Sequence, residues 1–258
     1  MLTALLVDEE LSHMARYALE PMPYPEAGQA LRDALGTTSG RLKVGVINSL
    51  AIRKDEQAVP ELTKLLSDSD AMIMQAAAVS LGQIANAEAQ KALEDAIAQA
   101  NSPRGNLNAL CDGLLGCAEK LALKQQPKEA IRLYDLVLQA PNATPQVRSA
   151  AMRGAVLNRN TEEALPLLMA QLGGKDADDF SGALRVAREL SGNQDVTAAL
   201  AGFLPAAPLE RKILILGVFG EDDGDAAGAA VLAEAADGDA GVRAAALRAL
   251  TRMHYSPA

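Results

Sequence analysis

The chain has 258 residues, and its 24 Lys and Arg against 33 Asp and Glu leave a formal net charge of −9, spread over both halves. This acidity argues against a general affinity for the phosphate backbone of nucleic acids. Hydrophobic residues make up 49% of the sequence but aromatic residues only 3%, so the interior must consist mainly of small and aliphatic side chains, which suit closely packed helices.

Apolar runs in the sequence are short and are interrupted by charged residues or glycine. None is long enough to cross a bilayer, and residues 1–8 lack the basic segment and long apolar core of a signal peptide. We therefore expect neither a membrane span nor a signal peptide in this chain. Because repeat pattern begins almost at once, the chain is also compatible with excision from a longer, exported protein, so the sequence assigns no cellular location.

A small residue followed by an apolar one recurs along the chain at nearly constant spacing. Successive apolar members are 31, 31, 33, 41, 32, 31 and 32 residues apart, a period typical of stacked helical hairpins. We therefore predict seven to eight hairpins of two helices each. The pairs are Ala18–Leu19, Ser49–Leu50, Ser80–Leu81, Gly113–Leu114, Gly154–Ala155, Val186–Ala187, Gly217–Val218 and Ala249–Leu250.

The second helix of each predicted hairpin carries this pair. Its apolar residues recur three and four positions apart, as in a helix with one buried side. The small member is Ala, Ser or Gly in seven pairs, which indicates close approach of a neighbouring helix rather than contact with a ligand. The residue four positions before each apolar member is also apolar and is expected to be buried: Ala15, Val46, Ala77, Leu110, Ala151, Ala183, Leu214 and Ala246.

The first helices are predicted, in chain order, at residues 26–35, 58–66, 89–98, 163–172, 196–204 and 226–235. Turns rich in Asp, Ser and Gly separate the hairpins, for example at residues 67–70, 173–176 and 237–239. Pro60 and Pro166 fall near the start of first helices, where a missing amide is tolerated. No segment shows the sustained alternation of a strand, so we predict an all-α chain.

One interval, of 41 residues, is longer than the others. Its surplus lies between residues 117 and 141, where longer helices are expected. The order of Ala130, Tyr134 and Pro141 resembles a tetratricopeptide unit, which we place at about residues 105–142. The predicted fold is a single right-handed α-α superhelix, or solenoid, over residues 1–258 that includes this longer unit.

The period, the small residues and the acidic turns together resemble HEAT repeats over nearly the whole chain. Residues 56–92 are the most typical stretch, with VPEL at 59–62 opening a first helix, LLSD at 65–68 ending it, and AAAVSLGQI at 76–84 in the second helix. The resemblance implies an α-solenoid and brings no catalytic residues with it.

A narrower resemblance, carried by residues 11–22, 44–50 and 53–55, is to the HEAT regions of large, often exported, bacterial multidomain proteins. In such proteins the repeats accompany other domains, including carbohydrate-associated and redox domains. Their biochemical role is not settled, so this resemblance implies relatives but no activity.

Groups able to do chemistry are few and scattered. The two histidines, His13 and His254, are not expected to share a catalytic site, because distant repeats of a solenoid do not fold back on one another. Residues 173–176 lack the first Gly and the Ser or Thr of a phosphate loop, and the carboxylates of residues 221–225 lack the spacing of a calcium loop. We predict no enzyme, no metal and no cofactor.

The two cysteines, Cys111 and Cys117, lie six residues apart on one predicted helix. Their side chains point to different faces and are beyond disulfide reach. We expect both to be reduced and buried as small apolar residues; a reactive thiol is the alternative.

The outward-facing residues of the second helices are expected to line a concave wall and to meet a partner. Two positions before the apolar members stand Tyr17, Asn48, Val79, Asp112, Arg153, Arg185, Leu216 and Arg248. The preferred patch combines donors, acceptors and an aromatic ring: His13, Arg16, Tyr17, Asn48 and Arg53. A second patch, Arg153 with Arg185, would accept carboxylates of another chain. The alternatives are ordinary solvated helix faces and, for His13 and Arg16, capping or bridging of neighbouring helices.

These patterns favour a non-catalytic scaffold that binds a protein or a neighbouring domain of its own parent chain. One alternative is an accessory or lyase-like protein that acts on a cofactor-bearing partner, as some HEAT-like proteins handle tetrapyrrole attachment. The other is an inert spacer without a partner. The sequence does not identify the partner.

Overall fold

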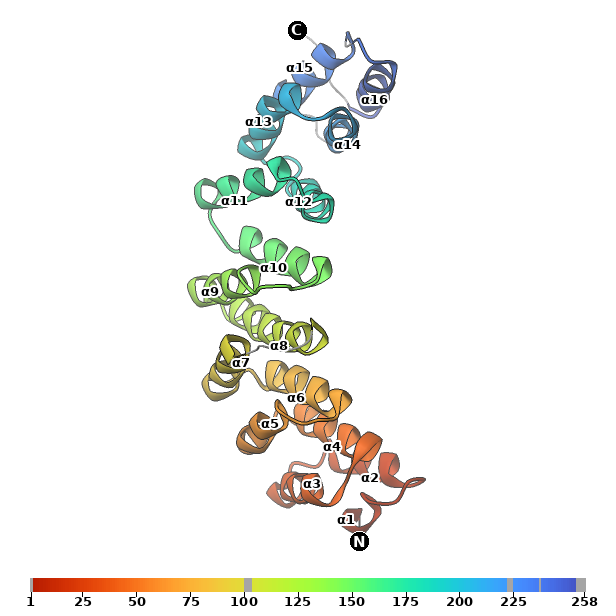
Figure 1. Ribbon diagram of the computed structural model, residues 1–258, viewed down its shortest axis with the longest axis vertical. Helices are drawn as coiled ribbons and strands as arrows, with labels where there is room; N and C mark the ends of the chain where they lie inside the picture. The colour runs from red at the N-terminus through yellow and green to blue at the C-terminus, as the bar shows by residue number, and fades with distance from the viewer. Residues whose placement is uncertain (1, 100–103, 222–224, 237, 254–258) are drawn as a thin grey trace. The chain divides into compact units, whose positions relative to one another are not determined.

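The computed structural model describes residues 2–99, 104–221, 225–236 and 238–253. Within these residues every regular element is a helix, and the helices follow one another as hairpins (Figure 1). The chain divides into two compact units, Met1–Gly154 and Ala155–Ala258, each of which is described by itself. The fold is an α-solenoid, as predicted.

The first unit contains four hairpins, the first of which begins with the short helix α1, and then α9 and most of α10. Odd-numbered labels mark first helices and even-numbered labels mark second helices. Its elements are α1 (Leu2–Leu5), α2 (Ser12–Leu19), α3 (Pro25–Thr37), α4 (Gly40–Ile52), the 3₁₀ turn η1 (Glu56–Ala58), α5 (Val59–Leu65), α6 (Ala71–Ile84), α7 (Ala87–Gln99), α8 (Arg104–Leu123), α9 (Pro127–Leu138) and α10 (Pro145–Leu157).

The second unit takes the end of α10 and repeats the alternation. Its further elements are α11 (Thr161–Gly173), α12 (Ala177–Glu189), α13 (Gln194–Phe203), the 3₁₀ turn η2 (Leu204–Ala206), α14 (Leu209–Phe219), α15 (Asp225–Glu234) and α16 (Ala240–Leu250). All eight pairs of small and apolar residues lie on even-numbered helices, which confirms the assignment of second helices.

Asp and Asn side chains fix where many of the helices begin. Asp70 accepts a hydrogen bond from the Met72 amide at 2.9 Å, and Asp176 and Asp239 cap α12 and α16 in the same way. These bonds satisfy amides that have no partner within the helix. The acidic turns of the sequence are therefore helix starts.

Proline behaves differently in two of the first helices. Pro60 stands in the first turn of α5, as expected. Pro166 instead lies inside α11, because that helix already begins at Thr161, where Asn160 accepts a hydrogen bond from the Glu163 amide. Its ring removes one backbone hydrogen bond of the helix, so its predicted place near the helix start is wrong.

Consecutive even-numbered helices of the first unit meet through the small residue of the pair. Ser49 of α4 donates a hydrogen bond to Glu20 Oε1 at 2.7 Å, just after α2, and Ser80 of α6 donates to the Ile47 carbonyl of α4 at 3.4 Å. Gly113 of α8 lies against the backbone of Ala78 in α6. The small residue thus faces the preceding even-numbered helix each time.

The contact between α6 and α8 is the closest of these. A Cβ on Gly113 would run into the carbonyl oxygen of Ala78, and one on Gly82 would run into the backbone of Gly113. Only glycine permits two helix backbones to approach this far. The predicted reason for the small residues, close helix approach, is confirmed here.

The pattern is displaced by one residue in α14. Leu214, predicted to be buried, is 49% exposed, whereas Leu216, predicted to face outward, is fully buried. A Cβ on Gly217 would meet only open space, so packing does not require glycine there. If Val218–Phe219 is taken as the pair, the residue four positions before its apolar member is Ile215, which is buried. The pattern of the other even-numbered helices then holds in α14 as well.

Candidate functional site

The residues of the preferred patch separate into two groups. His13, Tyr17 and Asn48 are exposed, with Tyr17 at 63%, and the rings of His13 and Tyr17 lie edge to face with centroids 6.3 Å apart. Arg16 and Arg53 are half-buried and bind neighbouring backbone instead. The first three residues are therefore available to a partner, and the two arginines hold the helices that present them.

Arg53, which follows α4, binds the turn after α2. Its Nη1 donates to the carbonyls of Leu19 and Met22, both at 2.6 Å, and of Glu20 at 3.0 Å. Carbonyls at a helix C-terminus lack partners within the helix and carry partial negative charge, which a guanidinium satisfies. Arg53 thus fixes the end of α2 on α4.

Arg16 bridges α2 and α4. Its Nη1 donates to the Gly45 carbonyl at 3.2 Å, and the guanidinium occupies the space that a side chain at Gly45 would fill. The bridging role that the sequence left open for Arg16 is the one it has here. Its Nε is buried and has no hydrogen-bond partner in the structure.

Arg153 of α10 and Arg185 of α12 are both exposed. They belong to different units, so the structure describes each of them separately. Each also interacts with neighbouring residues of its own. The predicted anion-accepting patch stays a prediction.

A nearly uncharged surface runs across four successive even-numbered helices of the first unit. Its residues occupy equivalent positions in each helix: five residues before the small residue of the pair, one residue before it, and three residues after it. All of them are exposed or half-buried. We call this surface the front face. It consists of His13 and Tyr17 on α2, Val44, Asn48 and Ile52 on α4, Gln75, Val79 and Gln83 on α6, and Asn108, Asp112 and Gly116 on α8.

The front face stands out by its charge in a chain of which 22% of the residues are charged. His13 and Asp112 are its only residues of the types that carry charge near neutral pH, and α6 contains no charged residue at all. Surrounding protein atoms desolvate the Asp112 carboxylate and raise its pKa. The sequence predicted one row of equivalent positions across the four helices, which runs from Tyr17 to Asp112. It did not predict the two rows on either side as parts of the same surface.

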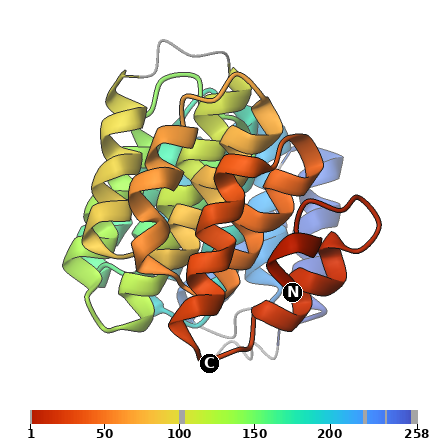
Figure 2. The ribbon, with the colours of Figure 1, turned by 90° about the horizontal axis from the view of Figure 1, so that it is seen from below.

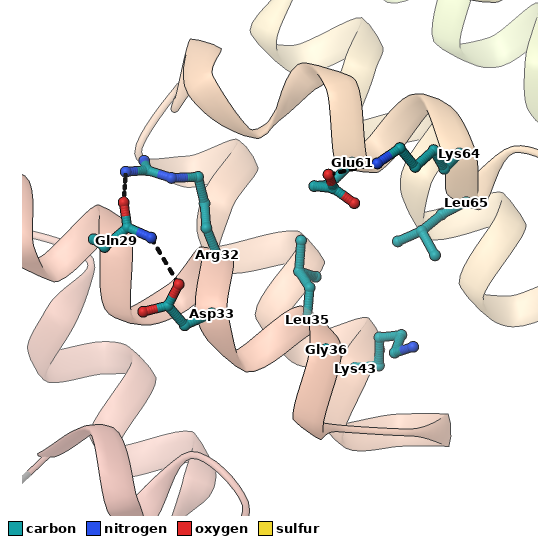
Figure 3. Close-up of a pocket in the computed structure, with 9 residues that line it drawn as sticks. All are labelled: Gln29, Arg32, Asp33, Leu35, Gly36, Lys43, Glu61, Lys64 and Leu65. Atoms are coloured by element: carbon teal, nitrogen blue, oxygen red, sulfur yellow. Dashed lines mark hydrogen bonds and ion pairs between the residues drawn. The ribbon is translucent and has the colours of Figure 1, made fainter.

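A hollow of about 620 Å³ lies elsewhere on the first unit, between α3, α4 and α5 (Figure 3). Its polar groups largely bind one another: Gln29 accepts from Arg32 and donates to Asp33, and Lys64 pairs with Glu61 at 2.7 Å. The sequence analysis did not indicate this hollow. Because several of its polar groups are already engaged with one another, we regard the front face as the stronger candidate for recognition.

Residues 28–110, from α3 into α8, match the family model described as HEAT repeats. This part of the chain is built of HEAT repeats. Over its whole length the chain is similar in fold to a chain in the structure of Kap95p with RanGDP, with a TM-score of 0.61 and 16% identity, and it spans 41% of that chain. At this identity the likeness shows the fold alone.

Two further solved structures are similar to this chain at lower scores. Human deoxyhypusine hydroxylase has 21% identity and a TM-score of 0.42, with 97% of this chain and 94% of that chain covered. The complex of CpcE and CpcF of phycocyanin lyase from Nostoc has 21% identity and a TM-score of 0.45, with 98% and 92% covered. No curated protein matches the chain.

Reactive groups are dispersed over the part of the chain that the structure describes. There, no three His, Cys, Asp or Glu residues gather as a metal site would require. Within the same residues no helix combines the length and apolarity needed to span a bilayer. His254 and most of the acidic turn at 221–225 lie outside the described residues.

The two cysteines are buried in α8 and form no disulfide, as predicted. Burial raises the pKa of Cys111 to about 11 and that of Cys117 to about 12. The thiolate is the nucleophilic form of cysteine, and burial disfavours it at neutral pH. Both residues therefore serve packing rather than chemistry.

Proposed function

We propose that this chain is a non-catalytic interaction scaffold that binds another protein, or a neighbouring domain of a parent chain, through the front face. The observation that carries the proposal is the near absence of charge over eleven equivalent surface positions on four helices. The core of a protein interface is depleted in charged residues and enriched in aromatic residues. Tyr17 and Ile52, 63% and 59% exposed, would be its anchors.

Rigidity of the supporting helices also favours this role. Arg16 and Arg53 bind α2 to α4, and the glycine contact binds α6 to α8. A surface that is already ordered loses little conformational entropy when a partner binds. The fold is also compatible with protein binding, since Kap95p, whose structure with RanGDP shares this fold, binds another protein.

The decisive experiment introduces charge into the front face without changing side-chain size. A double variant, Asn48→Asp with Gln75→Glu, adds two carboxylates there. Its matched control, Gln57→Glu with Gln99→Glu, adds the same charge at exposed positions of η1 and α7. Each protein is immobilised, exposed to native extract, and the retained proteins are identified by mass spectrometry and then purified for affinity measurement.

A partner of the front face will bind the unaltered chain and the control equally, and the front-face variant at least about tenfold more weakly. Equal binding by all three proteins would place the interaction on another surface. Absence of any specific partner would instead favour the spacer. A pigment-bearing partner whose absorbance changes on binding would favour the accessory role.

A further inference from the structure

Asp112 is the one carboxylate of the front face, and it has no partner among the described residues. It lies on the exposed side of α8, and within the described chain neither a hydrogen bond nor an ion pair engages it. Neighbouring protein atoms desolvate the carboxylate and raise its pKa, and no cation of the described chain opposes this effect. Such a carboxylate is stabilised when a cation arrives from outside.

The surroundings of Asp112 suit a long side chain that approaches from outside. Helices α6 and α8 are neighbours, as Figure 1 shows from the side and Figure 2 from the end of α1. The residue of α6 equivalent to Asp112 is Val79, which is half-buried. One turn after Asp112, on the same side of α8, stands Gly116, which has no side chain. An aliphatic stem can therefore lie over Val79 and Gly116 with its charged end at Asp112.

Backbone contacts hold Asp112 in place before any partner binds. The next residue, Gly113, lies against the backbone of Ala78, and Gly82 of α6 lies against the backbone of Gly113. Asp112 therefore stands beside the closest contact between even-numbered helices of the first unit. A carboxylate on an ordered backbone loses little conformational entropy when it is bound.

Other charged residues near Asp112 do not satisfy it. Helix α6 has none, and on α8 Glu119 and Lys120 lie two turns further along with opposite charges. On α10, Arg148 binds a nearby backbone carbonyl, and Arg153, at the position equivalent to Asp112, interacts with other residues. Adjacent helix axes are about 8–10 Å apart, close to one Debye length at physiological ionic strength. Salt therefore weakens the repulsion between Arg153 and a cation held at Asp112.

On the basis of the function proposed for the front face, we propose that Asp112 receives a basic side chain, Arg or Lys, from the bound protein. The segment of the partner that covers the front face is then uncharged apart from this one cation. Both oxygens of the carboxylate are available, and a guanidinium can bind both through parallel hydrogen bonds, which favours Arg. A partner with a carboxylate at this position is repelled, so Asp112 also excludes the wrong partners.

Selection from a displayed library of random linear peptides on the immobilised chain tests the proposal. Peptides of about fifteen residues can cross the roughly 30 Å occupied by four neighbouring helices. Those kept are bound by the unaltered chain but not by the double variant Tyr17→Ala with Ile52→Ala. They are expected to carry Arg or Lys at one position, and Asp112→Asn is expected to weaken their binding at least about tenfold. Asp33→Asn removes the same charge at an exposed position of α3 and is expected to leave binding unchanged.

Reversal of the charge tests the pairing directly. Asp112→Lys is expected to lose the basic peptides and, in a new selection, to retain peptides with Asp or Glu at that position. Circular dichroism and urea unfolding confirm that each variant is folded. Front-face peptides that lack a basic residue, or that Asp112→Asn binds equally well, would overturn the role of Asp112 and leave the proposed function standing. Absence of any peptide that depends on Tyr17 and Ile52 would overturn both.

Discussion

Gly113 shows how much depends on a single missing side chain. Gly113→Ala is expected to destabilise the protein by about 2 kcal/mol, because the added methyl group meets the carbonyl oxygen of Ala78 and backbone on both sides must move. Gly36→Ala is the control, since a Cβ there meets only open space and alanine favours the helix by up to about 1 kcal/mol. Urea unfolding measures both. Equal effects would show that α6 and α8 are farther apart than described.

The buried thiols make stability depend on alkaline pH. Their pKa values of about 11 and about 12 lie above that of an exposed thiol, so the unfolded chain loses these protons first. The stabilisation is complete below about pH 8.5 and is lost as pH rises through the folded-state values, by about 1.4 kcal/mol per pH unit and thiol. Urea unfolding at stepwise pH measures the free energy of unfolding, which should decline less steeply with alkaline pH for Cys117→Ala than for the unaltered chain. An equally steep decline would contradict a contribution of the buried Cys117 thiol.

The sequence predicts which small residues are buried more readily than it predicts which groups the long side chains contact. Seven positions of the expected buried stripe are buried because their spacing alone determines which side of the helix they occupy. Arg53 could not be assigned in this way, since its partners are carbonyls of a turn some thirty residues earlier. Its charge indicated a ligand contact, whereas the fold uses it internally.

At the scale of the element, Arg53 is the residue that holds α2 in place. Arg53→Lys is expected to cost about 1–2 kcal/mol, because an ammonium group cannot span several carbonyls as the planar guanidinium does. Hydrogen exchange of the amides in α2 and the turn after it should accelerate. Arg41→Lys, at an exposed position of α4, should change neither quantity.

Helix α14 shows where reading a period from sequence fails. Gly217 fits the expected small residue, yet the interval between repeats varies by one or two residues and leaves Val218 equally possible. Only the three-dimensional surroundings distinguish them: a Cβ on Gly220 would lie 3.4 Å from the Cα of Ala249 in α16, whereas one on Gly217 would meet open space. A glycine in a helix is therefore a weak marker of close packing unless its neighbour is known.

At the scale of the whole molecule, charge distribution predicts how partners respond to salt. Binding through the front face should change less than about threefold between low and high ionic strength, because only His13 and Asp112 among its eleven positions can carry charge near neutral pH. Binding through Arg153 and Arg185 would instead weaken steeply with salt. Titrating a purified partner in both conditions separates these surfaces, and a strong salt dependence would exclude the front face.

The fold was predictable from sequence because a period near 32 and a recurring small residue are properties of the chain itself. The division into two units was not, since no composition change or linker marks residue 154. The front face was predictable only in part. One row could be read from the pair positions, but its lack of charge becomes evident only when helices α2 to α8 are placed side by side.

The use of a small residue at three successive contacts between even-numbered helices of the first unit bears on how such chains lengthen. Residues near 54–84 begin and end at equivalent points, with Lys54 and Ala85 both in the left-handed backbone conformation after their helices. A tandem copy of that segment would place its own Ser80 where Gly113 now lies against the backbone of Ala78. Growth by gene duplication would therefore need either a glycine at that position or a wider spacing of the two helices at the new junction.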